Sequence, residues 1–389
     1  MVNPILGNNS LIENLKMNIK IKLVKNKSDK IRFIKSMWNF YQGDDNFVPP
    51  IIADRMKLLD EQKNPLYKHA EIQLFIALKN DEVIGRIAAI TNQAHNDTHH
   101  DNIGFFGFFE CINNQEVANA LFDEASNWLR SKGKDKIRGP LNPSTNDEIG
   151  LLIENFSEPP YILMTYNPKY YMNLIDNYGF EKAKDLYAYR LKYEDFASDK
   201  LKRLVDAVTE RNQITIKQVD FKKNFKNDVS LIKEIYNKAW QPNWGFVKMN
   251  DEEFDFMAND LKQLAEPSLA YFSYVKGNLA GFHLSLPNYN QVFKYNKSGS
   301  LLGALWCMLT KKKKITQSRI IILGILPEYQ RTGVDAVMYM QSGIRANKLN
   351  MADAEASWIL EDNEMMNKGL TTTMNGKLYR KYRIYEKKL

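Results

Sequence analysis

The chain has 389 residues, of which 44% are hydrophobic and 12% are aromatic. This length exceeds what one hydrophobic core usually serves, so two domains are expected. The net charge of +8 is a mild excess that a solvated basic surface explains, although it would also suit phosphate-bearing ligands or RNA. Only two cysteines occur, and neither lies in a Cys-x-x-Cys pair, which argues against a disulfide framework and against a zinc site.

The first 16 residues are polar and unpatterned, which predicts a disordered tail at 1–16, and Met17 opens an alternating strand pattern. The sequence shows no charged-then-apolar leader and no apolar run near the roughly 20 residues that span a bilayer. Its longest apolar run, Leu301 to Leu309, predicts a buried helix, and the lysines at 311–314 predict a solvated basic end. These patterns favour a cytoplasmic protein with no membrane partner.

The two halves of the chain repeat the same order of patterns. Residues 74–90 and 270–286 each predict two strands around a tight turn, with Gly85 and Gly281 in equivalent places. After each hairpin come an apolar strand, an amphipathic helix, another strand and, behind a glycine, an aromatic strand. These segments are residues 103–110, 117–129, 136–141 and 179–189 in the first half, and 320–328, 334–344, 354–360 and 376–385 in the second.

The repeat predicts two copies of a mixed α/β unit. We place the first copy at residues 17–193 and the second at residues 212–389. The segment between them, residues 194–211, has a helical pattern and is expected to be a connection.

One strand–turn–helix segment in the second half predicts an anion site. The apolar run that begins at Ile320 breaks at Pro327, passes through a polar turn and continues as a helix. A helix start of this kind offers free backbone N–H groups and the positive end of the helix dipole. The turn resembles the acyl-CoA pyrophosphate loop of the GNAT acyltransferase superfamily, whose motif is Gln/Arg-x-x-Gly-x-Gly/Ala. Gln330 and Gly333 match this motif, whereas Asp335 does not, and its carboxylate would repel a nearby diphosphate by roughly 1–4 kcal/mol.

The order of elements in both halves also resembles the GNAT fold, which implies two tandem domains, each a mostly antiparallel mixed sheet flanked by helices. The first half has no pyrophosphate loop, so the resemblance places acetyl-CoA or a longer acyl-CoA in the second half only. There it implies that an amide of Ile325 or Leu326 binds the thioester carbonyl. Asn363 would lie near the cofactor or simply cap a helix. The phosphates would be bound by the loop residues Gln330, Arg331, Thr332, Gly333 and Val334.

No spacing specifies the general acid and base that acyl transfer to an amine needs. Glu355 could face the cleft and act through a water, or it could be a solvated carboxylate. His283, among apolar neighbours, is a second candidate, with a core histidine as the alternative. The tyrosine that often serves as the family's general acid is missing before Gly376, so Tyr382 or Tyr379 is expected either to replace it or to pack in the core.

Two loops are candidate acceptor-binding segments. The aromatic loop at 236–246 predicts a pocket formed by Trp240, Asn243 and Trp244, or else a hydrophobic plug over the sheet. The polar loop at 142–150 could donate hydrogen bonds to a substrate or serve only as a turn. The histidines at 95–100 lie in a polar loop with no carboxylate tied to them by spacing, so no metal site is expected.

These patterns leave several functions open. The first is an N-acyltransferase that moves an acyl group, such as acetyl, from acyl-CoA to an amine of a small molecule or an amino acid. The second is a Fem-type transferase that takes aminoacyl groups from tRNA, which the basic charge and the imperfect loop would suit. A non-catalytic protein that binds an acyl or nucleotide ligand is the third, and a purely structural protein is the last.

Overall fold

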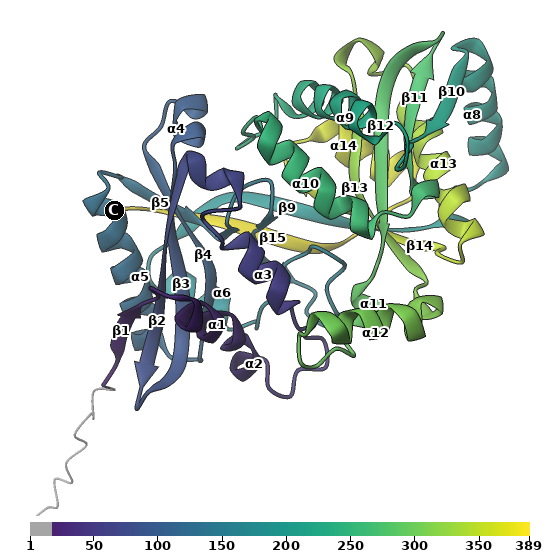
Figure 1. The fold of residues 1–389 in the computed structure, drawn as a ribbon. Coiled ribbons are helices and arrows are strands. Elements are labelled where there is room, and N and C mark those ends of the chain that lie inside the picture. Colours follow the sequence, from purple (N-terminus) through teal and green to yellow (C-terminus); the bar gives the residue numbers. More distant parts are fainter. Residues whose placement is uncertain (1–17) are drawn as a thin grey trace, which may run out of the picture.

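A computed structural model describes residues 18–389, and the predicted tail at 1–16 lies outside this part. Two lobes lie side by side, and one 13-stranded sheet runs through both of them (Figure 1). The predicted mixed α/β fold, with mostly antiparallel strands flanked by helices, is confirmed. The strand order is β1-β2-β3-β4-β5-β15-β9-β14-β13-β12-β11-β10, with β8 paired to β15.

In the N-terminal half, the predicted hairpin is β2 and β3, joined at Asn80 and Asp81, whose positive φ angles of 47° and 65° suit a tight hairpin turn. Helix α5 packs against it because Gly85 has no side chain: a Cβ there would lie 2.7 Å from Leu121 Cδ1. The elements are β1 (Lys20–Leu23), α1 (Lys27–Lys35), α2 (Met37–Phe40), α3 (Ile52–Leu58), η1 (Pro65–Lys68), β2 (Ala70–Lys79), β3 (Glu82–Asn92), α4 (Gln93–His99), β4 (Ile103–Cys111), α5 (Gln115–Ser131), β5 (Lys136–Gly139), β6 (Leu141–Asn142), β7 (Glu148–Ile149), β8 (Leu151–Glu154), α6 (Tyr171–Asn177) and β9 (Glu181–Lys192).

The C-terminal half repeats this plan, with hairpin β11–β12 turning at Lys276 and Gly277. The predicted helical connection corresponds to α7 (Tyr193–Phe196) and α8 (Asp199–Arg211), and α8 packs against α13. The remaining elements are β10 (Ile214–Gln218), α9 (Phe225–Trp240), α10 (Asp251–Leu264), η2 (Pro267–Leu269), β11 (Ala270–Val275), β12 (Asn278–Pro287), α11 (Asn290–Phe293), α12 (Leu301–Lys311), η3 (Lys312–Lys314), β13 (Gln317–Ile325), η4 (Pro327–Tyr329), α13 (Val334–Lys348), β14 (Asp353–Leu360), α14 (Glu364–Lys368), the π-helical turn η5 (Gly369–Thr373) and β15 (Lys377–Lys388).

The last strands of the two halves are exchanged. Strand β9, which ends the first half, pairs with β14 of the second, and β15, which ends the second half, pairs with β5 and β8 of the first. The two exchanged strands also pair with each other, so they cross between the lobes as one ribbon (Figure 1). The boundaries expected from the sequence therefore follow the repeat, whereas the hydrogen-bonded sheet crosses them.

Each half contains two parallel strands that pair over only part of their length and then diverge. In the first half, β4 and β5 pair only at residues 103–105 and 136–138. In the second, β13 and β14 pair only at residues 317–320 and 353–356, although both strands continue beyond these residues. Each half therefore has a V-shaped gap in its sheet where backbone groups lack a neighbouring strand.

The apolar run at Leu301–Leu309 forms the predicted helix, α12, but the expectation that this helix is buried is wrong. The exposed fractions of Leu302 and Leu309 are 79% and 84%. Only Ala304 and Cys307 of the helix are buried, because α12 lies on the outside of the lobe and packs mainly against α11. Among the described residues, none of the helices has the length and apolar character needed to cross a bilayer.

Neither lobe has a complete sheet without the strand that the other half supplies. We therefore expect the two lobes to be stabilised and destabilised together. Leu186 on β9 is fully buried and lies opposite both Leu360 and Tyr382. We expect Leu186→Ala to lower the free energy of unfolding by about 2–5 kcal/mol and to destabilise both lobes together. Hydrogen exchange of the β2–β3 and β11–β12 hairpins should show equal losses of protection. Leu204→Ala, at an exposed position on α8, is the control, and loss of protection in one lobe alone would contradict the prediction.

Candidate functional site

The gap between β13 and β14 is the first component of the site. The Leu326 amide donates to the Ala280 carbonyl at 2.9 Å, so it belongs to the sheet and is not available for a thioester carbonyl. Hydrogen bonding alternates along an antiparallel strand, so the peptide groups of Ile325 and Leu323 point the other way, toward the gap. The amide predicted at Ile325 thus has the orientation that the chemistry needs, and Leu323 offers a second such amide that the sequence did not reveal.

The loop at the start of α13 lies at the open end of this gap. Arg331 and Gly333 have φ angles of 62° and 86°, and together they turn the chain into the helix. Thr332 Oγ donates to the Tyr329 carbonyl at 2.6 Å, and Gln330 Nε2 donates to the Ile325 carbonyl at 3.4 Å, which ties the loop to the end of β13. Within residues 18–389 no side chain caps the helix, so the amides of its first turn, which begins at Val334, remain available for an anion.

Asp335, the residue that departs from the family motif, lies in the first turn of α13. Its charge adds to burial in raising the pKa of Tyr339, one turn further along the helix. The carboxylate therefore lies on the side of α13 that carries Tyr339. Arg331, in the loop that precedes the helix, is exposed and adds a positive charge to this segment.

The equivalent gap in the N-terminal half is filled by the chain itself. Asn142 Oδ1 accepts a hydrogen bond from the Phe108 amide at 2.6 Å. Gly107 permits this close approach, since a Cβ there would lie 1.7 Å from the Leu141 carbonyl oxygen. The gap between β4 and β5 is therefore closed to an extended ligand. Such a ligand is expected in the gap of the C-terminal half instead.

Glu355 lies in the interior, at the junction of the two halves. It is fully buried, accepts hydrogen bonds from the Ser357 and Tyr379 hydroxyls and lies 3.9 Å from the Arg319 guanidinium. This burial matches neither the solvated carboxylate nor the water-linked base that the sequence suggested. Burial and the Glu355 charge together raise the pKa of Tyr379, so its hydroxyl stays protonated and donates.

Residues 155–163 of the N-terminal half form a strap that covers this cluster. Arg319 Nη1 donates to the carbonyls of Ile162 and Leu163, at 2.8 and 3.0 Å. Arg380, which is fully buried on β15, donates to the carbonyls of residues 155, 158 and 159. Two buried guanidinium groups thus hold the strap by its backbone.

The other predicted catalytic residues are also buried. Tyr382 on β15 is inaccessible to solvent, and within residues 18–389 its hydroxyl makes no hydrogen bond. His283 stacks on Tyr271 at 4.8 Å, and its Nε2 lies 2.8 Å from Ser285 Oγ on the side of the sheet that α13 covers. Burial lowers the pKa of His283 to about 3, so this histidine is neutral at physiological pH and has the surroundings of a core residue.

The two tryptophans of the aromatic loop lie in different places. Trp240 stacks on Tyr236 at 4.9 Å and covers Gly324 of β13, where a Cβ would lie 2.4 Å from its ring. Trp244 reaches the N-terminal half and lies over the Arg138 guanidinium at 4.9 Å. Asn243 forms the turn between them, its amide donating to the Trp240 carbonyl at 2.8 Å. Trp240 alone therefore borders the gap, whereas Trp244 packs between the halves.

The polar loop at 142–150 reaches across to the C-terminal half and carries an exposed carboxylate. Tyr236 donates to Asn146 Oδ1 at 2.9 Å, which places the loop beside Trp240 and β13. Asp147 is open to solvent on one side, but protein surrounds it on the others. This partial desolvation, with the charge of Glu148, raises the pKa of Asp147 to about 6, against an opposing hydrogen bond from Ser144 Oγ at 2.6 Å. The charge of Asp147 adds to burial in raising the pKa of Tyr236, so this carboxylate lies in the loop that contacts α9, and its own pKa gives it the properties of a general base.

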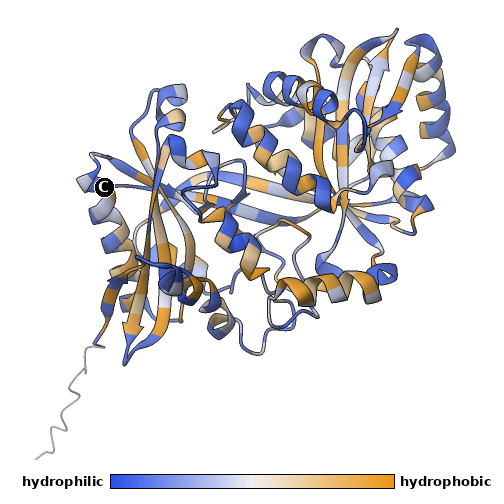
Figure 2. Ribbon diagram, in the orientation of Figure 1, coloured by the Kyte–Doolittle hydropathy of each residue, from blue (hydrophilic) through white to orange (hydrophobic). Residues whose placement is uncertain are grey.

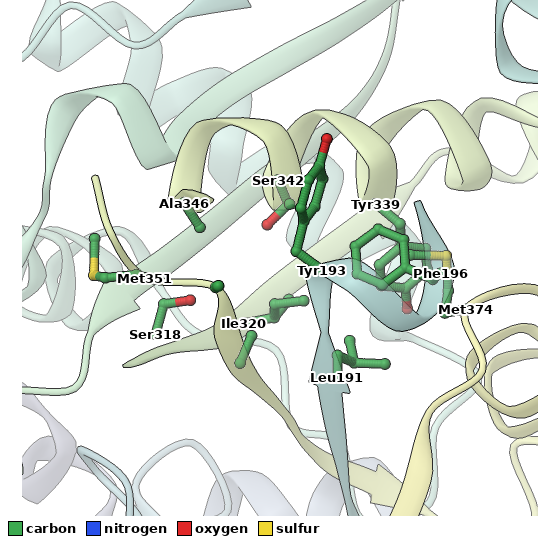
Figure 3. Close-up of a pocket in the computed structure, with 13 residues that line it drawn as sticks. Leu191, Tyr193, Phe196, Ser318, Ile320, Tyr339, Ser342, Ala346, Met351 and Met374 are labelled. Carbon is green, nitrogen blue, oxygen red and sulfur yellow. The ribbon is translucent and has the colours of Figure 1, made fainter. Parts of the chain in front are cut away.

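Two further features lie outside this cleft. Asn363 caps α14, accepting from the Met366 amide at 3.1 Å, so its carbonyl oxygen serves the helix. A small pocket lies between α13 and strands β9, β13 and β14, where Tyr339 and Ser342 meet Leu191 and Ile320 (Figure 3). Its free volume of about 20 Å³ has room for about one water molecule.

The sequence identified the loop at 142–150 as a candidate segment but did not single out Asp147, because the loop's contact with Tyr236, made through Asn146, comes from the other half of the chain. The only local signal was the polarity of the loop at 142–150. Within the described residues no cluster of three or more His, Cys, Asp or Glu side chains is arranged to hold a metal ion.

Comparison with known proteins identifies relatives of the same length. No protein-family model matches the chain. Protein YghO of Escherichia coli (strain K12) is 32% identical over 377 residues, covering 95% of this chain and 95% of the relative. The bacterial ceramide synthase of Caulobacter vibrioides (strain NA1000 / CB15N) is 32% identical over 378 residues, covering 94% and 96%. Among solved structures, a tandem GNAT protein from the clavulanic acid biosynthesis pathway shares the fold with a TM-score of 0.58 at 10% identity, covering 95% of this chain and 98% of that one.

The raised pKa of Asp147 predicts a pH-dependent stability difference. Its protonated form favours folding below the unfolded pKa near 4, and this contribution is lost as the pH rises through about 6. We therefore expect Asp147→Asn to raise the melting temperature by roughly 1–2 °C at pH 8, and the gain should shrink toward zero at pH 4. Differential scanning calorimetry across this range measures the difference, with Asp206→Asn, at an exposed position on α8, as the control. A gain that is independent of pH would contradict the assignment.

Proposed function

The chain belongs to the GNAT-like acyltransferases in their tandem form, and from this we propose that it transfers an acyl group from acyl-CoA to an amine. The observation that carries the proposal is the gap between β13 and β14, which continues into the uncapped start of α13. The inward-facing amides of Leu323 and Ile325 suit an extended, amide-containing chain. The helix start suits an anionic group at the end of that chain.

The residues at this site fit acyl-CoA better than the sequence motif alone suggests. The positive φ angles of Arg331 and Gly333 turn the loop so that α13 begins with unpaired amides. Asp335 opposes an anion, but its carboxylate lies on the Tyr339 side of the helix. We infer that the diphosphate would be held by the backbone amides from Gln330 to Val334 and by the Arg331 side chain, while the thioester end would lie along β13.

The same geometry suggests how an amine would react. The amine nitrogen attacks the thioester carbon, the carbon–sulfur bond breaks, and the thiolate leaves with a proton from solvent or from the acceptor. Asp147, on the loop that bonds to Tyr236, takes a proton from the attacking nitrogen, and its pKa of about 6 leaves it largely ionised at neutral pH. The Ile325 or Leu323 amide stabilises the negative charge that develops on the thioester oxygen. Glu355 and Tyr379, behind the strap, act as positioning residues for β13 and β14.

The relative with a named activity suggests the class of acceptor. A ceramide synthase joins an acyl chain to the amine of a long-chain amino alcohol, and 32% identity over almost the whole of both chains makes this acceptor class the one to test first. An amphiphilic amine suits this region, because Asp147 and Ser144 belong to the polar loop whose Asn146 bonds to Tyr236, and Tyr236 stacks on Trp240.

The donor site is tested by binding of CoA. We expect CoA at 100 times its dissociation constant to stabilise the fold by about 2.7 kcal/mol, which calorimetry detects as a rise in melting temperature. Arg331→Glu should weaken CoA binding at least about tenfold, and Asp335→Asn should strengthen it by about fivefold. Arg203→Glu, an exposed charge reversal on α8, should leave the affinity unchanged. If neither variant differs from wild type, the phosphates are not bound at this loop.

The acceptor and the base are tested by product analysis. We expect purified protein with a fatty acyl-CoA and a long-chain amino alcohol to form an amide, detected by mass spectrometry together with free CoA. Asp147→Asn should lower kcat by about 10²-fold or more with little change in KM for acyl-CoA. Activity of the wild type should rise as the pH increases through about 6, and this rise should be absent from the residual activity of Asp147→Asn. Full activity in that variant would remove Asp147 from the mechanism.

A further inference from the structure

Helix α12 presents an apolar face to the outside of the molecule. Leu302, Leu305, Trp306 and Leu309 follow the i, i+3, i+4, i+7 spacing that puts side chains on one face of a helix. Figure 2 shows the helix coloured hydrophobic along most of its length, at the lower edge of the C-terminal lobe. The exposed side chains and their exposed fractions are Leu301 51%, Leu302 79%, Leu305 52%, Trp306 67% and Leu309 84%.

This face is held in place by the surrounding structure. Ser300 caps α12, accepting from the Gly303 amide at 3.0 Å. Just before the helix, the Lys297 carbonyl accepts from Trp38 Nε1 at 2.7 Å and the Gly299 carbonyl accepts from the Ile52 amide at 2.9 Å. Both halves of the chain therefore fix the direction of the helix. Its apolar side chains cannot reach the core without breaking these contacts.

Lysines precede and follow the apolar face, and four of them form the run at 311–314 at the C-terminal end of α12. Residues 288–316 contain six lysines and no aspartate or glutamate. Tyr295, itself 47% exposed, has the ammonium groups of Lys294, Lys311 and Lys314 at 5.5, 4.9 and 5.8 Å from its ring. Lys312 has one acidic neighbour, Glu266, at 3.9 Å. The surface thus combines exposed leucines, a tryptophan, a tyrosine and an excess of positive charge.

We propose that α12 docks the protein on the surface of an anionic lipid bilayer. An apolar helix face with a tryptophan and flanking lysines is the composition of helices that lie in the plane of a membrane interface. At 11 residues, about 16 Å, α12 is suited to lying in that interface. The leucines and Trp306 enter the boundary between headgroups and acyl chains, and the lysines contact anionic headgroups. This proposal departs from the sequence-based expectation of no membrane partner, and it does not depend on the proposed acyl transfer.

Charge favours a bilayer over a second copy of the chain as the occupant of this surface. Two α12 faces packed in parallel would bring their lysine runs together, and packed antiparallel they would place each run beside residues 288–316 of the other copy, which carry no acidic side chain to balance it. An anionic bilayer supplies negative charge next to an apolar layer, which matches both properties of the surface. The occupant is therefore expected to be anionic phospholipid.

Vesicle sedimentation of the full-length protein tests the proposal. We expect binding to vesicles of phosphatidylglycerol and phosphatidylcholine, with little binding to phosphatidylcholine alone and a decrease at high salt. The triple variant Leu302→Ser, Trp306→Ser and Leu309→Ser should lower the partition coefficient at least about tenfold. The variant Lys312→Gln, Lys313→Gln and Lys314→Gln should also weaken binding and remove most of its salt dependence.

Matched controls separate this surface from general effects. Leu204→Ser removes an exposed leucine from α8, and Lys217→Gln, Lys222→Gln and Lys223→Gln remove three exposed lysines elsewhere; both should bind vesicles as wild type does. Circular dichroism and melting temperature should be unchanged, because all substituted side chains are exposed. Absence of vesicle binding, equal binding to neutral vesicles, or binding unaffected by the α12 variants would overturn the proposal. Dimerisation in light scattering that the α12 leucine variant abolishes, without vesicle binding, would instead identify a second copy as the occupant.

Discussion

The hydrogen bonding of β9 and β15 across the two halves is the constraint on which the rest of the structure depends. Each strand completes a sheet that began elsewhere in the chain, so removing either one would leave buried backbone groups without partners. The buried Arg319 and Arg380 also join the lobes by their hydrogen bonds to the strap, whereas Lys57 with Asp260 and Lys68 with Glu252 are exposed ion pairs, which contribute about 0–1 kcal/mol each. The relative position of the lobes is therefore set by the continuous sheet together with the strap.

With the lobes in this arrangement, the two copies of the repeat differ in what fills the gap between their parallel strands. In the first copy, Asn142 and Leu141 fill the gap between the parallel strands. In the second copy the gap has no such insertion among the described residues, and the first copy instead covers its far side with the strap and with the loop that carries Asp147. The arginines that hold the strap, Arg319 and Arg380, are buried charges whose removal would leave several carbonyl groups unpaired. Under the proposed function, a single site would thus be assembled from both copies, with the donor side in the second and the acceptor side formed partly by the first.

Local sequence patterns predicted the turns and helix starts, because these features depend on residues that are close together in the sequence. Alternating apolar residues around Asn80–Asp81 gave the hairpin, and the glycine in the turn after Pro327 gave the helix start at Val334. What could not be predicted depends on contacts between distant segments. The exchange of β9 and β15 leaves each strand's own pattern unchanged, and the contact of the loop at 142–150 with α9 joins segments about 90 residues apart, Tyr236 bonding to Asn146. For α12, periodicity identified the helix, but it could not show that the apolar face meets no other element of the described chain.

The exposed face of α12 and the loop that carries Asp147 are connected by one short segment. The chain at 297–299, which leads into α12, is bonded to Trp38 and to Ile52, the first residue of α3. One turn later on α3, Arg55 pairs with Glu148 at 2.5 Å, next to Asp147. A bilayer on the α12 face would therefore lie at the start of α3, about one turn of helix from the residue that pairs beside Asp147. If both proposals above hold, we expect an amine that carries a long apolar chain to reach Asp147 from the side of the protein that faces the membrane, because one short helix links the two surfaces.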